Sequence, residues 1–214
     1  MTMARVGLAL LVAVYAAGAL SAQTLQPAAS ASVVTSRVRS TVPGVTASGT
    51  TFLGDGSLTL GRVSLGVSYL QGTINPVAGP GTGSSRDLIE GAVRLGVHPT
   101  GWLTVSAGPH ARAYTLSSGT QRWLFWEVRA RAATAFVGSA VRGYTELWRA
   151  LSGDANVPEA FDHAQGAEAG MVVHLARSPL EARVAYRIDN AVLGGGTRVE
   201  TVDGVVVGVG LSWH

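Results

Sequence analysis

The chain has 214 residues, 28 glycines, no cysteine and a formal net charge of +3. The absence of cysteine excludes an exported scaffold that is held together by disulfides. So small a net charge, with no run of basic residues, argues against a protein that binds nucleic acid.

The first 22 residues are typical of a secretory signal peptide. Arg5 precedes an apolar run from Val6 to Leu20, and the small residues Ser21 and Ala22 follow it. The run is short for a transmembrane helix, which needs about 20 apolar residues. The pattern therefore predicts cleavage after Ala22, with an uncleaved membrane anchor as the alternative. Residues 23–31 are expected to form a short leader into a single domain, 32–214.

The remainder of the chain alternates between apolar and polar residues, with turn signals between the alternating segments. These segments are 32–41, 56–61, 63–74, 86–98, 102–116, 121–134, 139–150, 164–176, 180–191 and 204–214. Segments of about ten residues with period-2 alternation are the signature of a transmembrane β-barrel. The sequence therefore predicts an all-β fold, a closed antiparallel transmembrane β-barrel of ten strands, and eight or twelve strands remain open.

The connections between these segments are mostly long and short in turn. The long ones include residues 42–55, 75–85, 151–163 and 192–203. Outer-membrane barrels have long external loops and short periplasmic turns. With both ends of the barrel in the periplasm, the long connections are expected to be external, and an unknown ligand at these loops is one possible partner.

Alternation by itself does not tell which face of each strand points inward. A soluble lipocalin-like barrel has its apolar face inside, whereas a membrane barrel has it outside. In segment 180–191, Val184, Tyr186 and Ile188 oppose Arg183 and Arg187. The polar faces combine small residues with arginines and acids, which suits a crowded interior better than a water-facing surface. This favours the membrane arrangement.

Tryptophans and the last segment point the same way. Trp102 and Trp213 fall at the expected periplasmic level, and Trp123, Trp126 and Trp148 fall at the external level, as in two interfacial aromatic girdles. The final residues, GVGLSWH, have an apolar face and an aromatic close to the end. In these features the chain resembles the small bacterial outer-membrane β-barrel proteins of Gram-negative-type envelopes.

This resemblance implies an outer-membrane location, a lipid bilayer as surroundings, and recognition of the last strand by the outer-membrane assembly machinery. The usual terminal residue of the class is Phe, whereas here Trp213 is followed by His214. The resemblance covers residues 32–214 as an architecture, and it matches no single family by motif.

The most conspicuous polar feature is a set of arginines and acids on the faces that are expected to point inward. Its central members form a predicted lumen charge network of Arg94, Arg112, Glu127, Arg129, Arg131, Arg142, Glu146, Arg183 and Arg187. The wider set adds Arg37, Arg39, Glu90, Glu168, Glu181 and Asp189. Buried charges must be paired or hydrated. The set predicts either a lumen that is plugged by ion pairs, which is favoured, or a small anion-selective passage.

No motif for catalysis, metal or cofactor stands out. Omptin proteases resemble the ten-stranded architecture, but the adjacent Asp162 and His163 would point to opposite faces of a strand, which predicts a solvated loop pair. The histidines, His98, His110, His163, His174 and His214, are dispersed, and there is no G-x-S-x-G and no P-loop. No metal site and no cofactor are expected.

The sequence thus favours an outer-membrane barrel of structural or surface-interaction type, with a lumen that is largely filled by side chains. A porin-like pore for small solutes or anions is the alternative, and a membrane-embedded enzyme comes third.

Overall fold

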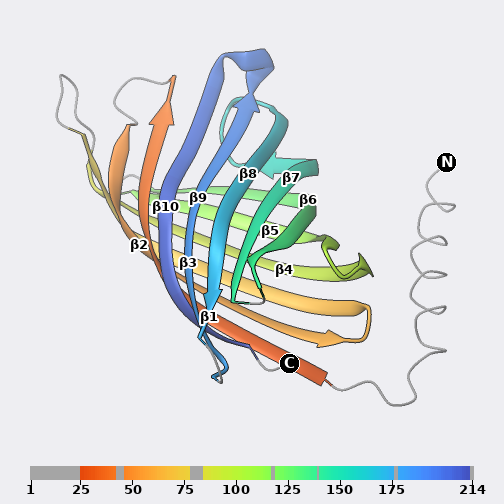
Figure 1. The fold of residues 1–214 in the computed structure, drawn as a ribbon. Coiled ribbons are helices and arrows are strands. Elements are labelled where there is room, and N and C mark those ends of the chain that lie inside the picture. Colours follow the sequence, from red (N-terminus) through yellow and green to blue (C-terminus); the bar gives the residue numbers. More distant parts are fainter. Residues whose placement is uncertain are drawn as a thin grey trace, which may run out of the picture.

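The computed structural model describes residues 25–41, 46–77, 84–116, 119–138, 140–175 and 178–212, which form a closed antiparallel barrel (Figure 1). The strands are β1 (Leu25–Ser40), β2 (Ala47–Leu60), β3 (Val63–Pro76), β4 (Arg86–Thr100), β5 (Leu103–Leu116), β6 (Gly119–Val137), β7 (Val141–Ala155), β8 (Phe161–His174), β9 (Leu180–Leu193) and β10 (Arg198–Ser212). The predicted fold class and the number of ten strands are confirmed.

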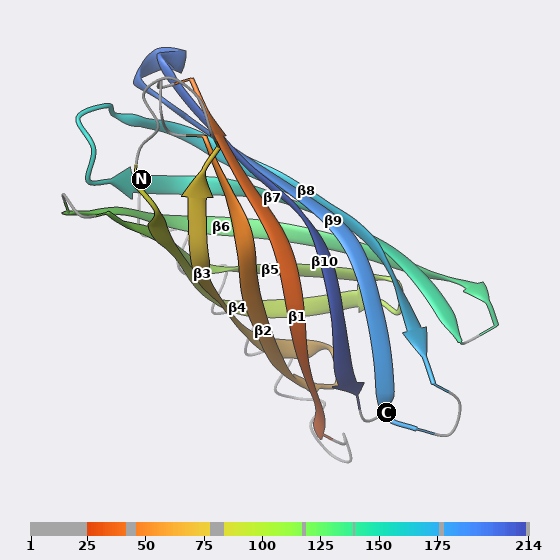
Figure 2. The ribbon, with the colours of Figure 1, turned by 90° about the vertical axis from the view of Figure 1, so that its left-hand side faces the viewer.

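Each strand pairs with its neighbours in sequence, and β1 closes the barrel by pairing with β10 (Figure 2). Val33 lies opposite Val207 in this closing pair. Closure leaves no unpaired strand edge, which a strand exposed to lipid requires because lipid offers no hydrogen bonds. Leu25 and Ser212 begin β1 and end β10 at one end of the barrel. We call this the terminal end and the opposite end the loop end.

The strands extend further than the alternation predicted. Residues 47–55, expected in a long external loop, belong to β2, and much of 151–163 and 192–203 is also strand. β1 begins at Leu25, so most of the expected leader 23–31 pairs with β2 and β10. Backbone hydrogen bonds between neighbouring strands continue through these segments, although apolar and polar side chains do not alternate regularly along them. Consequently the connections at the loop end are shorter than expected.

The connection from β9 to β10 is a tight turn made of three glycines. Gly194, Gly195 and Gly196 have φ values of 57°, 65° and 91°, a left-handed run that other residues adopt only with strain. The Asp162 carboxylate accepts a hydrogen bond from the Gly195 backbone N–H at 2.6 Å. Asp162 and His163 lie in β8, not in a loop, and this carboxylate holds the neighbouring turn.

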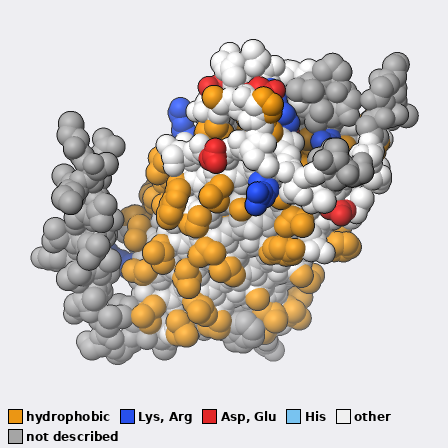
Figure 3. Space-filling model, turned by 180° about the vertical axis from the view of Figure 1, so that it is seen from behind, with side chains coloured by type: hydrophobic (Ala, Val, Ile, Leu, Met, Phe, Trp, Pro, Cys, Tyr) orange, Lys and Arg blue, Asp and Glu red, His pale blue; other side chains and the backbone are white. Residues whose placement is uncertain are grey.

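A belt of apolar side chains covers the outside of the barrel. On β9, Val184 is 44% exposed, whereas Asp189, on the opposite face, is 3% exposed. Other exposed apolar side chains include Val33, Phe52, Leu65, Val67, Val93, Leu95, Leu124, Leu147, Met171, Val205, Val207 and Val209. Figure 3 shows hydrophobic side chains gathered over the lower part of one side, with charged side chains mainly above them. A water-soluble barrel would bury these side chains, so the lipocalin-like alternative is wrong.

Within its described part the chain contains no helix that is long and apolar enough to span a membrane.

Lipid exposure can be tested at two valines on the same outward face of β9. Val184→Arg places a charge in the middle of the apolar belt, and we expect it to lower the free energy of unfolding by about 2–4 kcal/mol. Val192→Arg, at the loop end of the strand, should cost about 0–1 kcal/mol. Denaturant titration of the barrel in lipid vesicles measures both. Equal, negligible losses would contradict lipid contact at Val184.

Candidate functional site in the barrel lumen

The loop half of the lumen holds packed apolar and aromatic side chains together with a few buried charged ones. The apolar and aromatic side chains come from positions close to the loop ends of their strands and are at most 4% exposed: Val38, Ile74, Leu88, Tyr114, Trp123, Phe125, Leu193 and Val202. Among the charged ones, Arg86 and Glu200 are buried, and the Tyr114 hydroxyl donates a hydrogen bond to Glu200 at 2.6 Å. The Phe125 ring stacks on Trp148 at 6.0 Å between centroids, and the His110 ring meets the edge of Phe125 at 4.8 Å. These packed rings fill this part of the lumen beside the charged network.

Glu127 forms the centre of the charged part of the lumen and is fully buried. Its Oε1 accepts hydrogen bonds from Arg94 Nε at 2.7 Å and Arg129 Nε at 2.6 Å. Its Oε2 lies 2.9 Å from His110 Nδ1. Arg129 also donates to Glu146 at 2.7 Å, so these side chains form one network across β4, β5, β6 and β7. A carboxylate with three such partners satisfies the pairing that burial demands.

A second group joins the opposite walls of the barrel. Arg112, from β5, donates to Glu90 at 2.8 Å and to Asp189, on β9, at 2.9 Å. Arg187 contacts the same two carboxylates, at 3.0 Å and 2.7 Å. The Trp148 Nε1–H donates to the other oxygen of Asp189 at 2.8 Å. Since β5 and β9 are not neighbours in the sheet, these bonds cross the lumen and brace it.

Towards the terminal end only some of the arginines are paired with carboxylates in the described part of the chain. Arg183 contacts Glu168 and donates to the Tyr144 hydroxyl at 2.7 Å, and its distance to Asp55 is 3.5 Å. The Arg131 guanidinium lies over the Tyr144 ring at 3.9 Å. Within the described residues Arg131 and Arg142 have no ion pair within 4.0 Å. Arg131 and Arg142 therefore lie on the inward faces, as the sequence predicted, but they form no ion pair with the rest of the described network.

A cavity of about 430 Å³ occupies the terminal half of the lumen. Its lining includes Ser57, Thr104 and Ser106, which lie near the terminal ends of β2 and β5, and it reaches the charged network at Glu90 and Arg129. Five arginines and six acidic side chains line it. The cavity is thus polar without an excess of positive charge.

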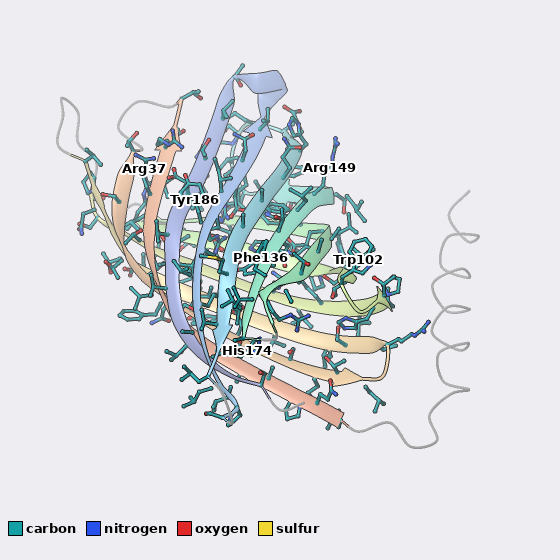
Figure 4. The ribbon with its side chains drawn as sticks, viewed as in Figure 1. Arg37, Trp102, Phe136, Arg149, His174 and Tyr186 are labelled. Atoms are coloured by element: carbon teal, nitrogen blue, oxygen red, sulfur yellow. The ribbon has the colours of Figure 1, made fainter. Side chains whose placement is uncertain are left out.

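Some side chains do not lie where the sequence predicted. Arg37 and Arg39 were expected in the lumen, but their side chains are 52% and 48% exposed on the outside of β1. Figure 4 labels Arg37 there. The period-2 pattern of β1 buries the even-numbered residues such as Val34 and Val38, so the arginines alternate to the outer face.

The predicted aromatic girdle is wrong for two of its members. Trp123 and Trp148 are 1% and 6% exposed and point into the lumen, where they fill space beside the charged network. Trp102 and Trp126 are exposed on the outer surface, at 57% and 56%, as a girdle requires. Trp213 lies outside the described residues. The prediction considered only how close each tryptophan lies to a strand end, and not which face of the strand it occupies. Trp123 lies on the same inward face of β6 as Glu127.

The sequence did not reveal that His110 joins Glu127 to the aromatic layer. The sequence signal for this role was that His110 lies two residues from Arg112 and therefore on the same inward face of β5. At the terminal end, His98 lies 3.1 Å from Ser64 Oγ and 3.0 Å from Thr104 Oγ1. No carboxylate takes part in this arrangement. Among the described residues, no group of three His, Asp or Glu side chains is placed to hold a metal ion.

No family model and no curated protein matches the chain in sequence. Solved structures do match. The outer-membrane protease OmpT from Escherichia coli has a TM-score of 0.61 at 8% identity, over 90% of this chain and 99% of that one. The translocator domain of the autotransporter NalP from Neisseria meningitidis covers 98% and 95% at 16% identity and a TM-score of 0.43. Neisserial surface protein A covers 90% and 100% at 11% identity and a TM-score of 0.40.

At 8% identity the match to OmpT establishes a shared fold and nothing about activity. The chain therefore has the fold of an outer-membrane β-barrel. The predicted fold is confirmed, and the apolar outer belt suits an outer-membrane location with a lipid bilayer around it.

The central role of Glu127 can be tested by removing its charge. Glu127→Gln leaves Arg94 and Arg129 without their shared carboxylate, and we expect a loss of about 3–5 kcal/mol in unfolding free energy, which lumen water would reduce. Glu181→Gln is the matched control near the terminal end, where the Glu181 side chain is 20% exposed, and about 0–1 kcal/mol is expected. Equal stabilities of the two variants in a urea titration would contradict a central role.

Proposed function

We propose that this protein is a non-conducting outer-membrane barrel of structural or surface-interaction type. The observation that carries the proposal is the crosswise pairing of Arg112 and Arg187 with Glu90 and Asp189, backed on the loop side by the apolar layer. An ion would have to break these pairs and then pass the packed loop half of the lumen, where the charges of Arg86 and Glu200 are themselves buried. Both steps are costly in a medium of low dielectric constant.

The charge of the lumen also speaks against an anion pore. An anion-selective passage needs unpaired positive side chains along its path. Here the carboxylates of the network engage the central arginines, and acidic side chains slightly outnumber arginines around the cavity. The cavity would form part of a path for a solute through the lumen. It is the feature of the described residues that favours the alternative function, a solute pore.

We further propose how the chain reaches and enters the membrane. Residues 1–22, which lie outside the described residues, act as a signal peptide, and the terminal end of the barrel faces the periplasm. The outward valines Val205, Val207 and Val209 of β10 form the apolar face that the assembly machinery recognises. Trp102 and Trp126 anchor the barrel at the two interfaces.

Because the lumen is closed in this proposal, we expect interactions with other molecules to take place at the loop end. Among the described residues, the strand ends there form an exposed rim whose polar side chains include Asp87, Arg122, Asp154 and Asp162. Mixed charges on a firm rim suit a contact with another surface molecule better than the enclosure of a small ligand.

Planar lipid bilayers test the proposal directly. After insertion of folded protein, checked by its heat-dependent shift on unboiled gels, we expect no stable current steps at neutral pH. Glu90→Gln combined with Asp189→Asn removes the carboxylates that hold Arg112 and Arg187, and anion-selective steps are expected to appear or increase.

The matched control is Glu159→Gln combined with Asp162→Asn, which removes two carboxylates near the loop end without touching the crosswise pairs. It should remain silent. Stable ohmic steps from the wild-type protein would contradict the proposal and establish the pore.

A further inference from the structure

The outer surface carries a cluster of charges that the lumen does not explain. Arg37 and Arg39 of β1 both contact Asp203 of β10, at 3.0 Å and 2.9 Å. The Tyr186 hydroxyl, from β9, donates to the same carboxylate at 3.0 Å. Figure 4 shows Arg37 and Tyr186 on the same side of the barrel. We call these four residues the outer arginine cluster.

The strand register places this cluster at the border of the apolar belt. Arg37 lies opposite Asp203, and two residues towards the terminal end Thr35 lies opposite Val205. Two residues further, Val33 lies opposite Val207, and both side chains are exposed to the outside. Towards the loop end Arg39 lies opposite Thr201. The cluster thus has an apolar surface on one side and a polar surface on the other.

The cluster keeps unused capacity to bind an anion. Two guanidinium groups share one carboxylate, which leaves one positive charge in excess. Each guanidinium donates to Asp203 through Nε and Nη2, and neither Nη1 group has a partner in the described part of the chain. Both arginine side chains are half-exposed. A depression of about 480 Å³ adjoins Arg37, and Thr35, Ser48 and Tyr186 help to line it.

We propose that the outer arginine cluster binds the phosphate of an anionic lipid in the leaflet at the loop end. Guanidinium groups suit phosphate oxygens because they offer parallel N–H donors. The acyl chains of such a lipid would lie along Val205, Val207 and Phe52, whereas free phosphate would gain nothing from them. The excess charge favours a lipid whose phosphate is not balanced by its own ammonium group.

Native mass spectrometry of the full barrel in detergent tests this site with two probes, phosphatidylglycerol and phosphatidylcholine. The wild-type protein should retain phosphatidylglycerol more strongly. Arg37→Gln combined with Arg39→Gln should lower that retention by about fivefold or more, the effect of one basic group near an anionic surface, and leave phosphatidylcholine unchanged.

Arg122→Gln combined with Arg149→Gln is the matched control, since both arginines are exposed on the outer side of β6 and β7. It should retain phosphatidylglycerol like the wild type. An equal loss in both double variants would overturn the proposal in favour of a general charge effect. Loss of wild-type retention in millimolar inorganic phosphate would also overturn it, because a simple anion site would then suffice. Equal wild-type retention of the two lipids would overturn it without any variant.

Discussion

The need to pair buried charges inside a narrow barrel is the constraint on which the rest of this structure depends. Glu90, Glu127 and Asp189 are each at most 5% exposed. An unpaired carboxylate in such surroundings would be strongly destabilising, so each must have arginine or imidazole partners. The partners come from walls that are not neighbours in the sheet, so satisfying the charges also fixes how the walls face one another.

This pairing divides the lumen into parts with different properties. The loop half contains apolar and aromatic side chains around a few buried charges such as Glu200, the middle contains the paired charges, and the terminal half contains the polar cavity. Trp148 joins these parts, because its ring stacks on Phe125 while its N–H donates to Asp189. In the described part of the chain, the lumen is thus hollow towards the terminal end and packed towards the loop end.

Much of this arrangement could be predicted from the alternation of residues along the strands. Arg94, Arg112, Glu127, Arg129 and Arg187 were expected in the lumen, because each shares a strand with outward apolar residues of opposite parity. The prediction was wrong for Arg37 and Arg39. Because β1 has valines on both faces, the pattern of apolar and polar residues does not indicate which face points into the lumen. The prediction also failed at Trp123 and Trp148, which were placed by height along the strand rather than by parity.

Other features lay beyond sequence reasoning for physical reasons. The partners of each arginine depend on barrel closure and register, and these bring β5 against β9 across the lumen. The length of β2 depends on backbone pairing of a Gly, Ser and Thr segment, which leaves no apolar alternation. The cavity depends on how far each side chain reaches from its wall.

Closure of the lumen towards the loop end can be tested most directly by cysteine accessibility, because the natural chain contains no cysteine. Ser106→Cys places one thiol in the wall of the cavity, and Gly101→Cys in the β4–β5 turn reports which side of a vesicle carries the terminal end. A small, charged, membrane-impermeant thiol reagent is then added on one side of reconstituted vesicles. We expect the thiol of the Ser106→Cys variant to react when the reagent is on the terminal side and to stay unreacted when it is on the loop side. Comparable reaction rates from both sides would contradict this expectation, because the lumen would then be a continuous aqueous path.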